Sequence, residues 1–232
     1  MKTIGLIGGL SWESTLTYYR LINQLVAARL GGLHSARILL SSFDFQDIET
    51  LQQQGRWDEA AACMVSAART LERGGADLAL ICSNTMHRMA DDVQRAIAIP
   101  LLHIADATAD GIRAHGLRKV GLLATAYTME QDFYKSRLGR AHGLDVLVPG
   151  EADRRIVHDV IYDELCRGVV RAESRREYVR IMRDLAGQGA EGIILGCTEI
   201  MLLVGQDDSP VPVFDTTTIH ARVAVDAALA PR

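Results

Sequence analysis

One segment of this chain occurs twice, and the repeat restricts the folds that the chain can adopt. Residues 75–85 align with residues 189–199, and in both copies an apolar stretch leads into small polar residues. In this alignment Ser83 is the counterpart of Cys197. A short apolar run that ends in polar residues is typical of a buried strand followed by a loop. We therefore predict two equivalent strand-to-loop sites, one with a hydroxyl group and one with a thiol.

Two further pairs of segments follow in the same order along the chain. Residues 4–9 resemble residues 120–125, and residues 100–106 resemble residues 212–215 more loosely. The alternative to duplication is chance resemblance, because a strand followed by a glycine and a helix recurs in all α/β units. The collinear order favours duplication of a unit of roughly 115 residues.

Short apolar runs alternate with longer segments that have a helical pattern. The predicted strands are 3–7, 36–41, 78–81, 101–104, 120–124, 144–147, 192–195 and 211–214. The predicted helices are 14–28, 56–73, 86–96, 108–114, 130–139, 154–167, 174–188 and 219–229. Several of the strands are apolar almost throughout, as expected for parallel strands that helices cover on both faces. The pattern predicts an α/β fold with mainly parallel sheets.

The repeat also predicts how the chain is divided. We expect two similar α/β half-domains related by pseudo-twofold symmetry, residues 1–116 and 117–216, with a C-terminal helix at 217–232 that could pack back on the first half. Open α/β sheets bind ligands at the carboxyl ends of their strands. If the halves face each other, these ends meet, and the active site would lie in the cleft between them.

Composition narrows the class of function. The formal net charge is -4 and no basic block stands out, so we expect no nucleic-acid partner. No apolar stretch reaches the ~18 residues of a membrane span, so we expect no membrane partner. The four cysteines lack CxxC spacing, which argues against a zinc site and against a secreted disulfide framework. With no signal-peptide pattern, a reduced, cytoplasmic enzyme fits best.

Cys197 is the first candidate for chemistry. It lies between Gly196 and the pair Thr198 and Glu199, at a predicted strand end. A thiolate can act as a nucleophile or as a base, and its pKa, about 8.5 in the free side chain, responds to its surroundings. The alternative is a small buried apolar side chain, which is the common fate of a free cysteine. The polar neighbours and the repeat favour a functional role.

The counterpart loop opens a predicted helix. Small polar residues in that place can cap the helix, or they can present hydroxyl and N–H groups to a carboxylate. We favour ligand binding by Asn84 and Thr85. Cys82 points away from Ser83 if the strand continues, which predicts a core residue. His87 lies one turn into the helix and is either packed or part of the site.

Three other segments provide weaker candidates. Residues 8–11 lack the spacing of a dinucleotide-binding or P-loop motif, but their N–H groups could cradle a carboxylate, which brings in Leu10. A tight turn is the alternative. Thr125 and Thr128, in the repeat counterpart, carry hydroxyl groups suited to an anion. Gln52 lies in a segment that could edge a lid or lie on the surface.

Taken together, these residues resemble the aspartate/glutamate racemase family. The resemblance runs along nearly the whole chain and is carried by GGLSWEST at residues 8–15, SNTMH at 83–87, YTM at 127–129 and GCTE at 196–199. It implies two similar α/β halves, an interdomain active site, racemisation of a small amino acid without a cofactor or metal, and usually a homodimer. No lysine lies in these motifs, in agreement with chemistry that does not use pyridoxal phosphate.

The resemblance implies two bases on opposite faces of the substrate Cα, one that takes the α-proton and one that returns a proton. The family normally has a cysteine directly before Asn-Thr, whereas this chain has Ser83. Serine is much harder to deprotonate than cysteine, but its hydroxyl can relay a proton. We therefore expect Cys197 to be the strong base, Ser83 to be a weak one, and the reaction to favour the L-enantiomer, as in members that carry threonine there.

The resemblance also implies which residues hold the substrate. Binding of its carboxylates and ammonium group is assigned to Leu10, Gln52, Asn84, Thr85, Thr125, Thr128 and Thr198, with support from Glu199 and His87. Two other hypotheses stay open. A decarboxylase or a cis-trans isomerase of a dicarboxylic acid could use the same scaffold, and a non-catalytic amino-acid-binding protein would bind without α-proton exchange.

Overall fold

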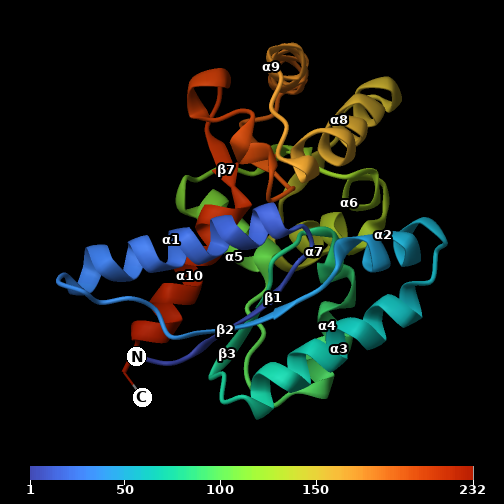
Figure 1. Cartoon of the computed structure of the whole chain (residues 1–232). Coiled ribbons are helices and arrows are strands. Elements are labelled where there is room, and N and C mark those ends of the chain that lie inside the picture. The colour runs from blue at the N-terminus through green and yellow to red at the C-terminus, as the bar shows by residue number, and fades with distance from the viewer. Residues whose placement is uncertain (232) are drawn as a thin grey trace. The chain divides into compact units, whose positions relative to one another are not determined.

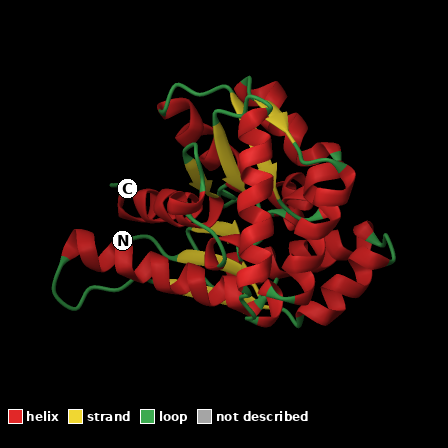
Figure 2. Ribbon diagram, turned by 90° about the horizontal axis from the view of Figure 1, so that it is seen from above, coloured by secondary structure: helices red, strands yellow, loops and turns green. Residues whose placement is uncertain are grey.

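The protein is described by a computed structural model over residues 1–231. Its internal contacts divide the chain into two compact units. Unit 1 comprises Met1–His103 and the segment from His220 onward, and unit 2 comprises Ile104–Ile219. Each unit contains one parallel β-sheet covered by helices (Figures 1 and 2). The predicted α/β class with parallel sheets is confirmed.

Unit 1 has a three-stranded sheet in the order β2-β1-β3. Its strands are β1 (Ile4–Gly8), β2 (Ile38–Ser42) and β3 (Leu78–Ile81). Its helices are α1 (Trp12–Leu30), α2 (Phe45–Gln53), α3 (Trp57–Arg73), the 3₁₀ helix η1 (Thr85–Met89), α4 (Ala90–Ala96) and α10 (Thr216–Leu229), whose first turn belongs to unit 2. A single parallel bridge joins Ala79 to Leu101 beside β3.

The alternation of side chains along β1 explains why both faces of this sheet are covered. Ile4 and Leu6 lie in one apolar cluster with Tyr18 of α1, whereas Ile7 lies in a second cluster with Met64 of α3. Successive strand residues point to opposite faces. Helices α1 and α3 accordingly lie on opposite sides of the three strands (Figure 1). Each large side chain that is fully buried in this way contributes about 1.5–3 kcal/mol.

Unit 2 has a four-stranded parallel sheet in the order β5-β4-β6-β7. Its strands are β4 (Lys119–Leu123), β5 (Asp145–Leu147), β6 (Gly192–Leu195) and β7 (Val213–Asp215). Its helices are α5 (Ile104–Ala114), α6 (Ala126–Glu130), α7 (Asp132–His142), α8 (Glu151–Asp163), η2 (Leu165–Arg167), α9 (Ala172–Gly187), η3 (Ile200–Leu202) and η4 (Gln206–Asp208).

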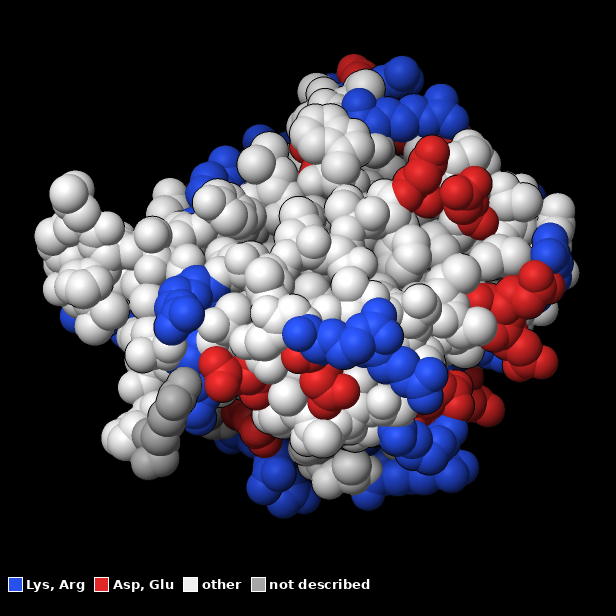
Figure 3. All heavy atoms as spheres, turned by 60° about the horizontal axis from the view of Figure 1, so that its bottom comes forward, with Lys and Arg blue, Asp and Glu red and all other residues white. Residues whose placement is uncertain are grey.

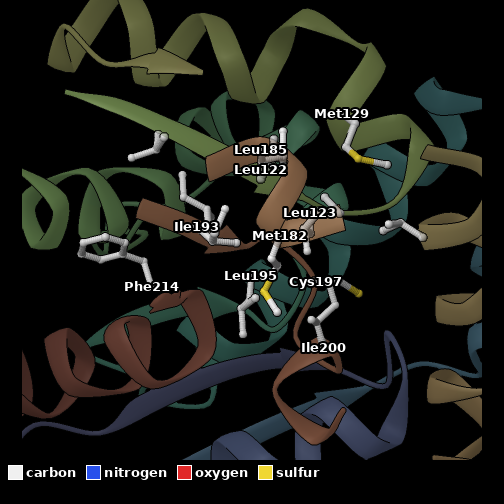
Figure 4. Packing of buried hydrophobic residues seen from close by; sticks show 14 of the residues in the cluster. Leu122, Leu123, Met129, Met182, Leu185, Ile193, Leu195, Cys197, Ile200 and Phe214 are labelled. Atoms are coloured by element: carbon white, nitrogen blue, oxygen red, sulfur yellow. The ribbon is translucent and has the colours of Figure 1, made fainter. Parts of the chain in front are cut away.

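The core of unit 2 reaches the end of β6. Side chains of the central strands, such as Leu122 and Ile193, pack with Leu185 of α9, and the same cluster continues to Cys197 (Figure 4). The approach of α9 is close, because a Cβ atom on Gly121 would lie 2.9 Å from Leu185 Cδ1. The candidate thiol therefore lies at the edge of the apolar core of unit 2.

The two sheets have the same register, which supports duplication. Ile4 pairs with Leu78 in unit 1, and Val120 pairs with Gly192 in unit 2. These are the residues that the sequence repeat treats as equivalent. The same correspondence holds for the Ala79–Leu101 bridge and the Ile193–Val213 pair. Ser83 and Cys197 thus follow equivalent strands of two related sheets.

The predicted strand at 101–104 is wrong. Only Leu101 makes a strand-like bridge, and α5 begins at Ile104, four residues before the predicted helix start. Ile104 and Ile112 are fully buried in the core of unit 2, so tertiary packing makes this apolar run helical. For the same reason α5 lies in unit 2, whereas the predicted boundary at residue 116 would place it in the N-terminal half.

Two helical segments also differ from the prediction. Helix α2 has no predicted counterpart, since its apolar positions are few, but Asp44 caps it by accepting from Gln46 N (3.0 Å) and Ile48 is buried. The predicted helix 130–139 is interrupted, because Gln131 adopts an extended conformation between α6 and α7.

Charged side chains form local pairs on the surface. Arg180 of α9 contacts Asp153, Glu177 and Asp184. On the face shown in Figure 3, basic and acidic side chains are interspersed and no large area has a single sign. Within residues 1–231, none of the helices combines the length and the apolar character that crossing a bilayer requires.

Candidate functional site

Polar residues follow the central strands of each sheet. In unit 1, Gly9 follows β1 and Ser83 comes two residues after β3. In unit 2, Thr125 and Cys197 come two residues after β4 and β6. Because these strands are parallel neighbours within their sheets, the residues of each unit gather at the carboxyl edge of its sheet, where α/β proteins bind ligands.

Cys197 has an acceptor for its proton in the same loop. Its Sγ atom donates a hydrogen bond to Glu199 Oε2 over 3.0 Å, and both side chains are buried. Burial raises the pKa of the Cys197 thiol well above its usual range, and the negative charge of Glu199 raises this pKa further. The resting group is therefore the thiol, with a carboxylate in position to accept its proton when the thiolate forms.

Other hydrogen bonds hold this loop in shape. Thr198 Oγ1 donates to Glu199 Oε2 (2.8 Å), so that oxygen accepts from two neighbouring side chains. Thr217 Oγ1 donates to the Thr198 carbonyl oxygen (3.4 Å), and Thr216 Oγ1 donates to that of Leu195 (2.8 Å). A buried carboxylate is costly unless donors satisfy it. The start of α10 and the loop itself thus fix Glu199 and the thiol together.

Thr125 and Thr128 form a helix cap in unit 2. Thr125 Oγ1 accepts from Thr128 N (3.4 Å) and lies 3.2 Å from Thr128 Oγ1. Ala126 N donates to Nδ1 of His158, and burial lowers the pKa of that imidazole, which favours the neutral acceptor. Thr125 therefore caps α6 at the same edge of the sheet as Cys197.

Ser83 has a similar capping contact in unit 1. Its Oγ atom accepts from Met86 N (3.4 Å), and its carbonyl oxygen accepts from Nδ1 of His87 (2.6 Å). The preceding Cys82 is fully buried in the core, as predicted, and burial raises the pKa of its thiol. Ser14 Oγ donates to the Cys82 carbonyl oxygen (3.0 Å), which ties α1 to this loop.

A group of imidazoles lies beneath the Ser83 loop. The ring of His87 lies 4.6 Å from that of His103 and 5.7 Å from that of His220. Nε2 of His220 donates to the Leu102 carbonyl oxygen (2.9 Å), so its Nδ1 accepts from the Tyr18 hydroxyl (2.8 Å) when the ring is neutral. Burial, with a smaller effect of His87, lowers the pKa of His220 to about 3. His220 is a neutral structural residue at neutral pH.

The other predicted binders of unit 1 are buried near the same loop. Gln52 of α2 donates through Nε2 to Met86 Sδ (2.9 Å), so its side chain contacts the segment that carries Asn84 and Thr85. Leu10 has its side chain in the apolar core next to α3, which leaves its backbone as the part able to contact a ligand.

Similarity to known proteins is consistent with this arrangement. The sequence matches the Asp/Glu/Hydantoin racemase family over residues 7–224. The chain belongs to this family. It is therefore an enzyme of the isomerase class, and the predicted family is confirmed.

Solved structures extend the similarity to nearly full length. A candidate Asp/Glu racemase from Yersinia pestis is 55% identical, with a TM-score of 0.92 over 99% of this chain and 100% of the other. An aspartate racemase homologue from Pyrococcus horikoshii is 36% identical, with a TM-score of 0.86 and the same coverage. The broad specificity amino-acid racemase RacX of Bacillus subtilis is 24% identical over 75% of this chain and 74% of its own length.

Two residues of this racemase outside the sequence motifs pack in or against the apolar cluster that contains the thiol. Tyr178 of α9 belongs to the apolar cluster that contains Cys197, and the partly buried Cys166 of η2 packs against that cluster. Burial is the main cause that raises the pKa of Tyr178. Charge on Cys197 and on Cys166 would raise this pKa further. Neither residue lies in a motif, and each fits an ordinary core position of a helix. Within residues 1–231 no group of three or more His, Cys, Asp or Glu side chains is arranged to hold a metal.

Proposed function

We propose that this racemase interconverts the enantiomers of aspartate or glutamate without a cofactor, with Cys197 as the principal base. The observation that supports this assignment best is the hydrogen bond from Cys197 Sγ to the buried Glu199 carboxylate. A thiol whose proton has an acceptor 3.0 Å away can become a thiolate without releasing that proton to solvent.

The proposed reaction begins when Glu199 takes the thiol proton. The Cys197 thiolate then takes the α-proton of the L-amino acid, so the Cα–H bond breaks and an S–H bond forms. The electron pair of the broken bond passes into the substrate carboxylate as an enediolate. The Ser83 hydroxyl then gives its proton to the opposite face of Cα, so its O–H bond breaks, a new C–H bond forms and the D-amino acid results. Glu199 releases the proton that it took and the Ser83 oxygen regains one from solvent, which restores the site.

The carbanion needs stabilisation by the protein, because no electron-withdrawing cofactor takes part in the proposed reaction. Hydroxyl and amide groups are suited to this function, and we assign it to Asn84, Thr85, Thr125, Thr128 and Thr198. Gln52 and the backbone of Leu10 would complete the binding of the substrate, and His87 would hold the Ser83 carbonyl group.

Ser83 makes the two faces unequal. A serine hydroxyl is a much weaker acid than a cysteine thiol, so proton return on this side is the slow step. Enantiomers have equal free energies, so kcat/KM must be the same in both directions. The difference between the two bases should therefore appear as a difference between exchange and inversion. The L-amino acid should exchange its α-proton with solvent, through Cys197, faster than it inverts.

Two further proposals concern the protein as a whole. We infer a homodimer, as usual for the family that the sequence resembles, and a cytoplasmic location, which the cysteine pattern favours. Light scattering coupled to size exclusion tests the first proposal, with twice the mass of 25.4 kDa expected.

Chiral chromatography of a panel of amino acids tests the proposed function. We expect L-aspartate or L-glutamate to yield its mirror image without added cofactor, and the panel to reveal whether the specificity is as broad as the name of the Bacillus relative states. Loss of carbon dioxide from malonates would favour a decarboxylase. Binding without any conversion would favour an amino-acid-binding protein.

A further inference from the structure

Helix α8 holds the short helix α6 at both of its ends. At the first residue of α6, Ala126 N donates to Nδ1 of His158 (3.2 Å). At its last residue, Glu130 Oε1 accepts from Nε of Arg154 (3.0 Å). Arg154 and His158 are four residues apart on α8, so they lie on the same face of that helix. The two helices pack against each other in unit 2 (Figure 1), and α8 thus fixes the place of α6.

The small size of α6 gives these contacts their importance. The helix has five residues, and Gln131, in an extended conformation, separates it from α7. Isolated helices shorter than about 12–15 residues are marginal in water, so α6 depends on tertiary contacts. Thr128 lies in its first turn and Thr125 directly precedes it. A displacement of α6 would therefore move both hydroxyl groups that are assigned to the substrate.

We propose that His158 is a positioning residue for racemisation, whose neutral imidazole accepts the Ala126 N–H group and thereby holds Thr125 and Thr128 in the place where they bind the substrate. This inference rests on the proposed function. His158 touches neither the substrate nor the transferred proton in this role, and it acts through the backbone of α6.

The donor in this contact decides the protonation state of the imidazole. A backbone N–H group can only donate, so Nδ1 of His158 is an unprotonated acceptor and the ring proton lies on Nε2. Protonation of Nδ1 would set two N–H groups against each other and break the contact. The hydrogen bond should therefore be present at neutral pH and be lost as the pH falls through the pKa of His158, which burial places below the ordinary value of about 6.5.

The groups around this imidazole come from α6 and α8. Burial is the main cause that lowers the pKa of His158, and three carboxylates that act in the opposite direction do not offset it. These carboxylates are Asp159, Glu130 and Asp163. The rings of Tyr127 in α6 and Tyr162 in α8 lie 6.0 and 4.8 Å from the imidazole, between ring centroids. The aromatic neighbours restrict rotation of the imidazole and keep Nδ1 directed at α6.

Two substitutions distinguish the acceptor from the bulk of the ring. His158→Asn keeps an acceptor, its side-chain oxygen, near the place of Nδ1 and does not titrate, whereas His158→Leu keeps apolar bulk without an acceptor. At neutral pH we expect kcat/KM to fall by about 3- to 10-fold in Leu, as for the loss of one hydrogen bond, and to change by less than about twofold in Asn. In the unchanged enzyme kcat/KM should also fall on acidification, and Asn should lack this acidic limb.

Either of two results would overturn the proposal: a Leu variant that matches the unchanged enzyme in kcat/KM, or an acidic limb that persists in Asn. His34→Asn and His34→Leu, at an exposed position of unit 1, are the matched controls and should keep the unchanged profile. Circular dichroism and thermal unfolding identify any variant that fails to fold. If Leu does so, His158→Ala replaces it, and the profile of Asn still tests the proposal.

Hydrogen exchange separates this inference from the proposed function. Exchange of the Ala126 amide proton, followed by NMR, requires no substrate. Protection in the unchanged protein and in Asn, with faster exchange in Leu, supports the contact even if no amino acid is racemised, and equal exchange in all three proteins contradicts it. An active enzyme in which Leu accelerates this exchange but keeps full kcat/KM contradicts positioning and leaves the racemase assignment intact.

Discussion

The thiol of Cys197 lies 3.0 Å from Oε2 of Glu199, two residues further along the same buried loop. An acid and its proton acceptor are thereby fixed by one short segment at the end of β6. The burial and charge that raise the thiol pKa disfavour a free thiolate, so ionisation depends on transfer to the neighbouring carboxylate. This dependence makes the chemistry of Cys197 sensitive to residues that act on Glu199.

Glu199→Gln should remove the proton acceptor while keeping a similar shape. We expect kcat to fall by about 10²- to 10⁴-fold with a much smaller change in KM, because general-base assistance is lost and substrate contacts remain. Steady-state kinetics with L-aspartate and L-glutamate measure both constants. Glu191→Gln, which alters an exposed carboxylate at the opposite end of β6, is the control and should keep full activity.

Ser83→Cys should strengthen the weak face of the site. A thiol ionises near pH 8.5, far more readily than a hydroxyl, so we expect inversion to accelerate by about tenfold or more and to approach the rate of α-proton exchange. Parallel measurement of deuterium incorporation and optical rotation gives the two rates. If inversion stays equally slow relative to exchange, Ser83 is not on the proton path.

His220 should make the fold sensitive to acid. Its pKa is about 3 in the folded protein and about 6.5 when unfolded, so the unfolded chain binds more protons between these values. Stability should therefore fall as the pH drops from about 6.5 toward 3, with this residue contributing up to about 1.4 kcal/mol per pH unit, and it should contribute no pH dependence above that window.

Urea unfolding of the His220→Gln variant as a function of pH tests this expectation. The variant should be less stable at neutral pH and should show a flatter pH dependence below 6.5. His34→Gln, at an exposed position, should follow the unchanged protein. Equal slopes for His220→Gln and the unchanged protein would mean that other groups cause the acid sensitivity.

Gly121→Ala should destabilise unit 2. The added Cβ would lie 2.9 Å from the side-chain ends of Leu185 and Ile193, so α9 must shift or its leucine must change conformation. Overpacking of this kind costs about 1–3 kcal/mol. Chemical denaturation measures the loss. At Gly187, at the end of α9, an added methyl group meets no neighbour within 4 Å, and Gly187→Ala should be neutral or stabilising.

Much of the fold could be predicted because its pattern is local. The apolar runs of β1, β3, β4 and β6 are short and bounded by glycine or polar residues, and the repeat aligns the same strands that the two sheets pair in equal register. The segment at 101–104 has the same apolar character, but a short apolar run of this kind fits the start of a buried helix as well as a strand. Contacts distant in the sequence decide in favour of α5, and no local signal reports them.

The candidate site could be predicted only as far as its motifs extend. Cys197, Glu199 and Ser83 stand out because they lie in short polar segments after strands. Cys166 and Tyr178 lie outside these motifs, and their place in or against the cluster that contains Cys197 depends on how η2 and α9 pack in unit 2. A free cysteine at an apolar position has the same local sequence whether it packs near a site or elsewhere in the core.

The most direct test of the account is the exchange of the substrate α-proton in deuterated water, followed by NMR with no cofactor added. We predict that L-aspartate or L-glutamate gains deuterium at Cα faster than it inverts, and that Cys197→Ala abolishes both processes while the variant remains folded. Exchange that persists in Cys197→Ala, or a folded wild-type enzyme that exchanges neither amino acid, would contradict the assignment of Cys197 as the principal base.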